Sequence, residues 1–169
     1  MIKFVVVATR FGWVAMGGSE AGLALLTLPK SSRKAALSEI KEFAPDALED
    51  TSAFDDLPNR LQRYFNGEKV LFPDRLDLSS ATTFHRAVWK ATLSIPYGET
   101  RTYAWVARQI GRPQAFRAVG GALARNPFPI IVPCHRVIAS SGNLGGFSGG
   151  LALKKQLLEL EGVRLDCLS

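Results

Sequence analysis

The residue types that could do chemistry together lie in the segment Pro133-Cys134-His135-Arg136-Val137. A free cysteine has a pKa near 8.5, so only about 3% of it is thiolate at pH 7, and it needs a base or positive charge nearby to react. His135 is a candidate for that base and Arg136 for that charge. The alternative is a buried structural cysteine, because neighbours in sequence need not have side chains that touch.

The surroundings of this pair favour a ligand-binding site. A proline-rich stretch, 126–129, and an apolar run, 130–132, which we expect to form a short strand, precede the pair. The glycine-rich loop, 142–150, follows it and contains five of the fifteen glycines. Its backbone can approach a planar ligand closely, with Phe147 as an apolar wall. Neither GxxxxGK[ST] nor GxGxxG fits the loop, which leaves a flexible surface loop as the alternative.

The first half of the chain must fold into elements that support this segment. Three apolar runs separated by glycines predict an antiparallel meander, namely residues 2–9, 12–17 and 22–28. We expect a helix from Ser31 or Ser32 to Pro45 and a second helix over 57–65. Residues 73–80 are typical of a linker, so we place an N-terminal domain at 1–80 and a C-terminal domain at 81–169.

Charge divides the chain at the same linker. Residues 1–80 contain ten Lys and Arg against eleven Asp and Glu, whereas residues 81–169 contain eleven against four. The net charge of +6 therefore belongs to the second half. Such an excess favours an anionic partner such as nucleic acid, with nonspecific basic solubility as the alternative.

The second half is predicted to be mostly helical. Capping residues and apolar spacing predict helices over 84–93, 103–110, 115–125 and 151–161. The second and third of these, joined by a glycine-containing turn, match a helix-turn-helix, although any two consecutive helices in a small α+β domain look similar. Glu161, at the end of the last helix, either orients a histidine or is exposed.

One face of the 115–125 helix is almost without side chains. Steps of three, four and seven residues from Arg117 reach Gly120, Gly121 and Ala124. Such a face allows close approach to another molecule but lacks the polar side chains that read bases. We infer close, sequence-independent contact with nucleic acid, with Arg117 inserted. The alternative is that this face packs against another helix.

Composition excludes several classes of protein. The 169 residues are 47% hydrophobic and 21% charged, as in globular proteins. They contain no apolar run of about 18 residues that could span a membrane, so we expect no membrane partner. The cysteines, Cys134 and Cys167, provide no disulfide framework, and the first residues lack a cleavage site, so we expect a cytoplasmic protein. Four residues could bind zinc, and none lies in 1–80, so we expect no metal; they are Cys134, Cys167, His85 and His135.

Four short motifs in a fixed order form a specific sequence signature. They are RAVGGA at 117–122, NP at 126–127, PCHRV at 133–137 and SGGL at 148–151. Over residues 82–164 the chain resembles the methylated-DNA–protein-cysteine methyltransferases, also called O6-alkylguanine-DNA alkyltransferases. The resemblance implies an α+β fold. Its N-terminal domain would be a ribonuclease-H-like antiparallel sheet with helices, and a mostly helical, winged helix-turn-helix-like C-terminal domain would contain the active site.

The resemblance implies direct reversal of DNA damage. An alkyl group on O6-alkylguanine, and also on O4-alkylthymine, in double-stranded DNA would pass irreversibly to Cys134. The protein would act once, as a monomer, without a cofactor. Two alternatives are an alkyltransferase-like protein, which binds lesions but lacks the acceptor cysteine, and a thiol hydrolase, which would turn over repeatedly.

The resemblance also assigns roles to single residues. Cys134 would accept the alkyl group, His135 would act as base through a water, and Glu161 would hold His135. Asn126 would organise the active-site turn. Tyr103 would help rotate the nucleotide out of the helix and donate a hydrogen bond to the leaving guanine.

Further residues would contact the DNA and the base. Arg117 would replace the flipped nucleotide in the stack. The DNA contacts are assigned to Arg117, Tyr103, Ala118, Gly120, Gly121 and Arg125, and the substrate pocket to Val137, Phe147, Ser148 and Gly149. The carbonyls of Cys134 and Val137 would accept from the guanine amine, and the Ser148 amide would bind O6. Phe147 replaces the tyrosine of many relatives, so we expect it to pack as an apolar wall.

Overall fold

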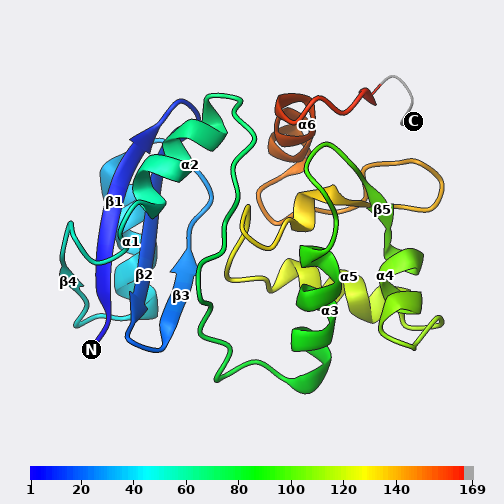
Figure 1. Cartoon of the computed structure of the whole chain (residues 1–169), viewed down its shortest axis with the longest axis horizontal. Helices are drawn as coiled ribbons and strands as arrows, with labels where there is room; N and C mark the ends of the chain where they lie inside the picture. The colour runs from blue at the N-terminus through cyan, green and yellow to red at the C-terminus, as the bar shows by residue number, and fades with distance from the viewer. Residues whose placement is uncertain (166–169) are drawn as a thin grey trace. The chain divides into compact units, whose positions relative to one another are not determined.

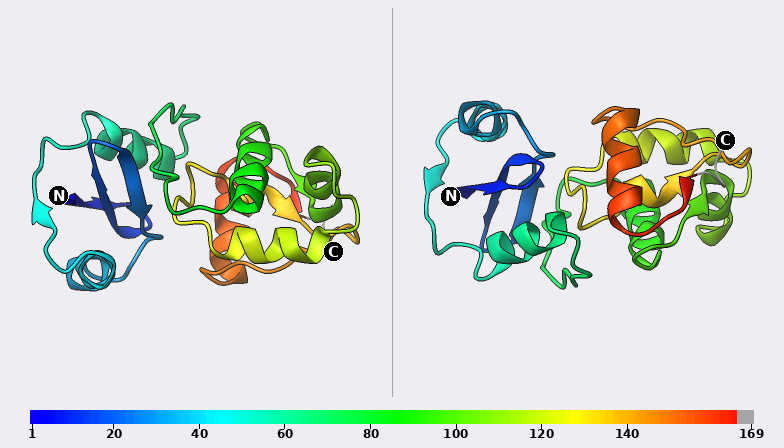
Figure 2. Two further views of the ribbon diagram at one scale, coloured as in Figure 1. Left: turned by 90° about the horizontal axis from the view of Figure 1, so that it is seen from below. Right: turned by 90° about the horizontal axis from the view of Figure 1, so that it is seen from above.

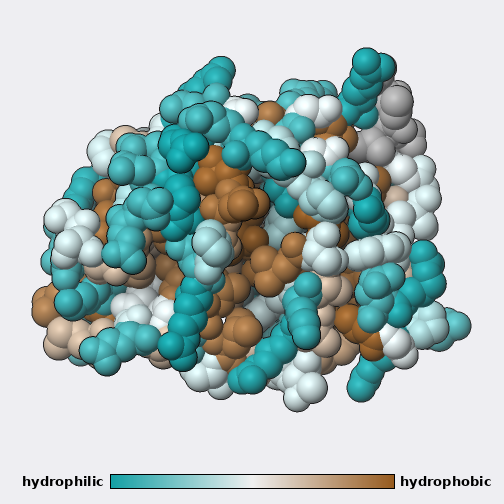
Figure 3. All heavy atoms as spheres, viewed as in Figure 1, coloured by the Kyte–Doolittle hydropathy of each residue, from teal (hydrophilic) through white to brown (hydrophobic). Residues whose placement is uncertain are grey.

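The computed structural model describes residues 1–165 and has a mixed α+β fold (Figure 1). Two compact units make up the chain, Met1–Ser80 and a second unit that begins at Ala81. Cys167 lies outside the described residues. No helix in the described part is long and apolar enough to cross a membrane, and hydrophilic side chains cover much of the face in Figure 3.

The first unit is built on a four-stranded sheet of order β3-β2-β1-β4. Its strands are β1 (Lys3–Thr9), β2 (Gly12–Ser19), β3 (Gly22–Leu26) and β4 (Leu48–Glu49). The three predicted apolar runs form the antiparallel part. The predicted antiparallel sheet has one parallel edge that the sequence did not indicate, because β4 pairs parallel to β1, with the Leu48 amide donating to the Ile2 carbonyl.

Two helices cover this sheet from opposite faces, as Figure 2 shows. They are α1 (Arg33–Phe43) and α2 (Leu57–Phe65). Ser32 caps α1 by accepting from the Ala35 amide at 3.1 Å. Side chains alternate along β1, so Phe4 packs with Ile40 of α1 while the neighbouring positions face the other side. The first unit therefore has a core on each face of its sheet.

The second unit is mostly helical. Its elements are α3 (Thr83–Leu93), β5 (Arg101–Thr102), α4 (Tyr103–Gln109), α5 (Phe116–Ala124), a 3₁₀ helix (Cys134–Arg136), β6 (Val137–Ile138) and α6 (Leu151–Leu160). Thr82 and Thr102 cap α3 and α4 through their hydroxyl oxygens. The three helices α3, α4 and α5 pack on one another, and β5 pairs parallel to β6. This pairing joins the start of α4 to the segment after Cys134.

The strand predicted over 130–132 does not form. These three residues are buried in a turn, and Ile130 adopts a φ of 77°, in the left-handed region. The Val132 amide donates to the Phe128 carbonyl at 2.8 Å, which closes the turn. The apolar run therefore marks burial in the unit's core and not pairing in a sheet.

Candidate active site

Cys134 faces a cavity of about 540 Å³ in the second unit. The start of α4, the outer side of α5, the 3₁₀ helix and the glycine-rich loop form its walls. Its lining residues are Tyr103, Phe116, Arg117, Gly120, Leu123, Ala124, Cys134, Gly146, Phe147 and Ser148. We call this space the cysteine cavity. It is mainly apolar, and its volume is in the range of small-molecule sites.

The structure brings together six of the residues predicted for DNA or substrate contact. Those lining the cysteine cavity are Tyr103, Arg117, Gly120, Cys134, Phe147 and Ser148. Ala118, Gly121 and Arg125 are exposed on or just after α5, outside the cavity wall. Gly149 is exposed beyond the wall, and Val137 is fully buried in β6. Of the four residues predicted for the substrate pocket, Phe147 and Ser148 therefore line the cysteine cavity, whereas Gly149 and the Val137 side chain do not.

The small-residue face of α5 is open. Ala118, Gly121 and Ala124 are exposed, and among the described residues no atom outside the local backbone of α5 lies within 4 Å of the point where a Gly121 Cβ would be. A Gly120 Cβ would meet only the Tyr103 ring, at 3.9 Å. The alternative that this face packs against another helix is therefore wrong. A second molecule can approach the backbone of α5 closely beside Arg117.

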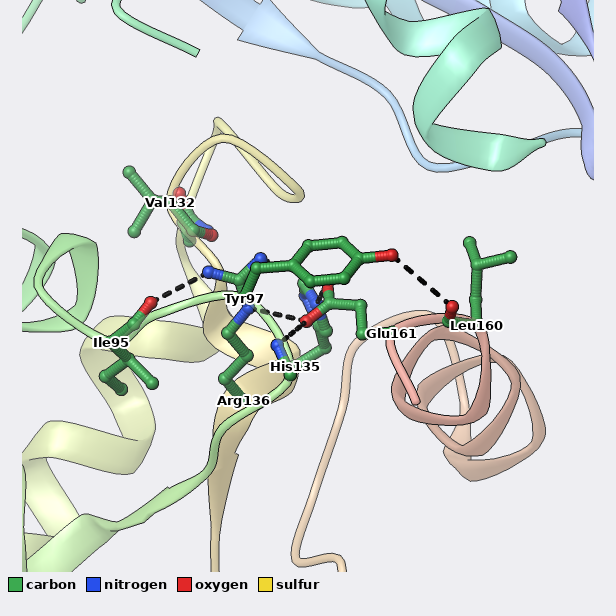
Figure 4. Close-up of polar contacts among 9 residues, drawn as sticks. Ile95, Tyr97, Val132, His135, Arg136, Leu160 and Glu161 are labelled. Carbon is green, nitrogen blue, oxygen red and sulfur yellow. Dashed lines mark hydrogen bonds and ion pairs between the residues drawn. The ribbon is translucent and has the colours of Figure 1, made fainter. Parts of the chain in front are cut away.

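Glu161, just after α6, is the centre of a buried polar cluster (Figure 4). Its Oε2 lies 2.6 Å from His135 Nε2, and both side chains are fully buried. Arg136 donates from Nε to Oε1 at 2.7 Å and from a terminal nitrogen to Oε2 at 3.1 Å. The same guanidinium donates to the Ile95 carbonyl at 2.8 Å, and the Gly98 amide donates to Oε1 at 3.3 Å. Glu161 therefore orients His135, and the alternative of an exposed Glu161 is wrong.

Arg136 has a different position from the one expected. From the sequence it was a candidate for the positive charge beside the thiol, but its guanidinium is bound to Glu161. Its planar group also lies 5.7 Å from the ring centroid of Tyr97. A guanidinium that makes two bonds to one carboxylate fixes its orientation as well as its charge.

The charges in this cluster follow from the balance between burial and hydrogen bonding. Burial would raise the pKa of Glu161, but bonds from His135 and Arg136 outweigh it and lower that pKa to about 2. Burial lowers the pKa of His135, although Glu161 acts in the opposite direction. An ionised carboxylate only accepts hydrogen bonds, so a neutral His135 has its proton on Nε2. Its Nδ1 then has the lone pair that a general base needs.

Cys134 itself is held mainly as the thiol. Burial raises the pKa of Cys134, while the Asn126 side chain and the Lys154 charge act in the opposite direction. Asn126 also fixes the preceding turn, because its Nδ2 donates to the Val132 carbonyl and its Oδ1 accepts from the Phe128 amide, both at 2.9 Å. A buried thiol of this kind needs a base to become a nucleophile.

Lys154 is a site residue that sequence reasoning passed over. It is fully buried, and its Nζ donates to the Val137 carbonyl at 2.6 Å, the Gly146 carbonyl at 3.1 Å and the Leu144 carbonyl. Burial lowers the pKa of Lys154 to about 8. The ammonium therefore joins β6 to the glycine-rich loop.

A pattern in the sequence could have identified Lys154. It precedes Leu157, Leu158 and Glu161 by three, four and seven residues, which places it on the buried side of α6. A lysine at such a position needs polar partners inside the protein.

The described residues show no metal centre. Nowhere in residues 1–165 do three His, Cys, Asp or Glu side chains gather closely enough to bind an ion.

Comparison with known proteins first identifies the class. Residues 83–163 match the family model described as 6-O-methylguanine DNA methyltransferase, DNA binding domain. The second unit, with its open helix and buried thiol, is thus a DNA-binding methyltransferase domain.

Relatives that match nearly the whole chain identify the family. The chain is 41% identical to the methylated-DNA–protein-cysteine methyltransferase of Methanosarcina barkeri over 156 residues, 92% of this chain and 94% of the relative. The crystal structure of the Mycobacterium tuberculosis O6-methylguanine methyltransferase has a TM-score of 0.79 at 41% identity, covering 95% and 93% of the two chains. That of the same organism's OGT in complex with DNA also gives 0.79, at 42% identity over 94% and 92%. The chain belongs to the methylated-DNA–protein-cysteine methyltransferase family, and the resemblance inferred from the sequence is confirmed.

Replacing the buried ammonium should loosen the glycine-rich loop. In Lys154→Met the carbonyls of Leu144 and Gly146 lose their donor, so we expect the Gly150 amide, which is bonded to Phe147 in this loop, to exchange about tenfold faster. Hydrogen exchange followed by NMR measures this. Lys155→Met, which changes the exposed neighbouring lysine, should exchange as the wild type does. Equal protection in Lys154→Met and the wild type would show that the loop does not depend on this ammonium.

The buried carboxylate should make stability depend on acid pH. The pKa of Glu161 is about 2 in the fold against an ordinary 4.5, so its contribution of about 3 kcal/mol is present above pH 4.5 and is lost as the pH falls towards 2. His135 acts in the same direction, because the unfolded chain takes up its proton first. Glu161→Gln should flatten the fall in the free energy of unfolding between these pH values, as measured by urea denaturation. The control is Glu159→Gln, exposed on the same helix. A Glu161→Gln profile as steep as that of the wild type contradicts the assignment.

Proposed function

We propose that this protein repairs DNA by moving the alkyl group of O6-alkylguanine in a duplex to its own Cys134. The observation that supports this most directly is the position of a buried thiol in a base-sized cavity. That cavity opens beside Arg117, on the bare face of α5. A nucleobase can reach such a thiol only after it has rotated out of the DNA helix, and Arg117 then enters the vacated position.

The transfer is a substitution at the alkyl carbon. His135 Nδ1 takes the thiol proton through a water, and Cys134 Sγ attacks the carbon. The bond from that carbon to O6 breaks and its electron pair stays on the guanine. The Ser148 amide at O6 and the Tyr103 hydroxyl stabilise the leaving base. Tyr103 lines the cavity, with its hydroxyl 3.3 Å from the Gly146 carbonyl.

The product is a thioether with no route back to the thiol, so each molecule reacts once. O4-alkylthymine presents the same kind of alkyl–oxygen bond on a smaller ring and is the second substrate. The carbonyls of Cys134 and Val137 accept from the guanine amine. Each already accepts one hydrogen bond, from Val137 and Lys154 respectively, and a carbonyl has a second lone pair.

The domain roles follow from the two units. The strand order β3-β2-β1-β4, with β4 parallel to β1, is consistent with a ribonuclease-H-like domain at 1–80. This domain acts as a support for the C-terminal domain. The α4–α5 pair beside β5 and β6 supports a winged helix-turn-helix at 81–169, which binds DNA and accepts the alkyl group. The monomeric state, the cytoplasmic location and the lack of a cofactor stay predictions from the sequence.

Transfer of label tests the proposal directly. With duplex DNA containing radiolabelled O6-methylguanine, we expect one equivalent of label on Cys134 and none on Cys134→Ala, as located by peptide mass spectrometry. The label should stop accumulating at one equivalent, because the thioether is stable. Label that remains on the DNA at saturating protein would refute the proposal. Repeated release of a labelled small molecule would instead indicate a thiol hydrolase.

The inserted arginine should matter only when a base has to leave a helix. Arg117→Ala should slow transfer from the duplex by about tenfold or more, with little effect on transfer from free O6-methylguanine. The control Arg164→Ala removes an exposed arginine elsewhere in the same unit. Equal losses on both substrates would mean that Arg117 acts on the cavity and not on the DNA stack.

A further inference from the structure

Phe116, the first residue of α5, has no part in the reaction described above. Its side chain is 46% exposed, yet it lines the cysteine cavity together with Arg117 and Cys134. Within residues 1–165 its ring makes no contact with another ring or with a cation. Phe84 differs in this respect, because its ring lies 5.8 Å from the Arg112 guanidinium.

The helix presents Phe116 in a particular setting. The other exposed residues of α5, apart from Arg117, are Ala118, Gly121 and Ala124. The two large solvent-facing side chains of this helix are therefore adjacent, at one end of a surface that a second molecule can approach closely. Gly120, four residues after Phe116, puts no side chain between the phenyl ring and the cavity.

Charge indicates what approaches this surface. Apart from Arg136 and Lys154, which are bound inside the active site, residues 84–155 contain eight Lys and Arg and one acidic residue, Glu99. Such an excess favours a strongly anionic partner. A phenyl ring at the edge of such a surface suits the face of a base, since base–aromatic stacking is independent of sequence. Apolar side chains inserted at a base step also help to open it.

We propose that Phe116 is a positioning residue for the DNA. Its ring stacks on the base next to the alkylated guanine in the same strand, while the adjacent Arg117 fills the vacated position. Phe116 lines the cysteine cavity, which the flipped guanine would occupy. Its ring therefore meets the base that neighbours this guanine. The inference rests on the proposed function, and it adds a second inserted side chain to the DNA contacts predicted from the sequence.

Transfer rates from two substrates test this role. Phe116→Ala should slow alkyl transfer from duplex DNA by about fivefold or more, the factor that corresponds to losing one stacked base. Transfer from the free base O6-methylguanine should keep the wild-type rate. Phe116→Trp, which keeps an aromatic face, should retain most of the duplex rate. The matched control is Leu93→Ala, because Leu93 is 45% exposed in the same unit and does not line the cavity.

The outcomes separate cleanly. Equal slowing on both substrates would make Phe116 a wall of the cavity and overturn the proposal, as would an unchanged duplex rate in Phe116→Ala. A wild-type free-base rate in Phe116→Ala also shows that the variant is folded. If the wild type transfers no label from either substrate, the proposed function fails, and that result is distinct from failure of the role of Phe116.

Discussion

The buried carboxylate of Glu161 is the interaction on which the active site depends. It accepts from the His135 ring, from two nitrogens of Arg136 and from the Gly98 amide. These donors come from the 3₁₀ helix and from the turn after α3, so one side chain joins three parts of the second unit. Burying an ion is costly unless each of its acceptors is satisfied, and here both carboxylate oxygens are. This arrangement fixes the orientation of the His135 ring and gives the neutral imidazole one defined tautomer.

The thiol is the opposite case, because the fold keeps it uncharged. Burial raises the pKa of Cys134, and the neighbouring Asn126 and Lys154 offset this only in part. A thiol held in this state reacts slowly with unrelated electrophiles in solution, and in the proposed reaction His135 activates it. On the proposed function, selectivity therefore comes from a cavity that admits a nucleobase beside Cys134, rather than from a permanently reactive thiolate.

The sequence predicted most helices and strands, and each of its failures has a physical reason. Local rules predicted threonine caps for α3 and α4, at Thr82 or Thr83 and at Thr100 or Thr102, and the structure uses Thr82 and Thr102. A specific motif indicated Cys134 and His135. The strand at 130–132 was wrong because an apolar run reports burial without distinguishing a turn from a sheet. The bonding partners of Arg136 and Lys154 lie eight or more positions away, so no local pattern specifies them, although helical spacing places Lys154 on the buried side of α6.

Helix α6 connects the two halves of the chemistry. Lys154 and Glu161 are seven residues apart, two turns of one helix face, so both point into the unit from the same side. The ammonium of Lys154 binds the loop that forms one wall of the cysteine cavity, and the carboxylate of Glu161, just past the helix end, binds His135. A displacement of α6 along its axis would therefore disturb both the glycine-rich loop and the His135 ring. The apolar contacts of Leu157 and Leu158, both fully buried between these two charges, fix that position, so packing in the core sets the geometry of a polar site.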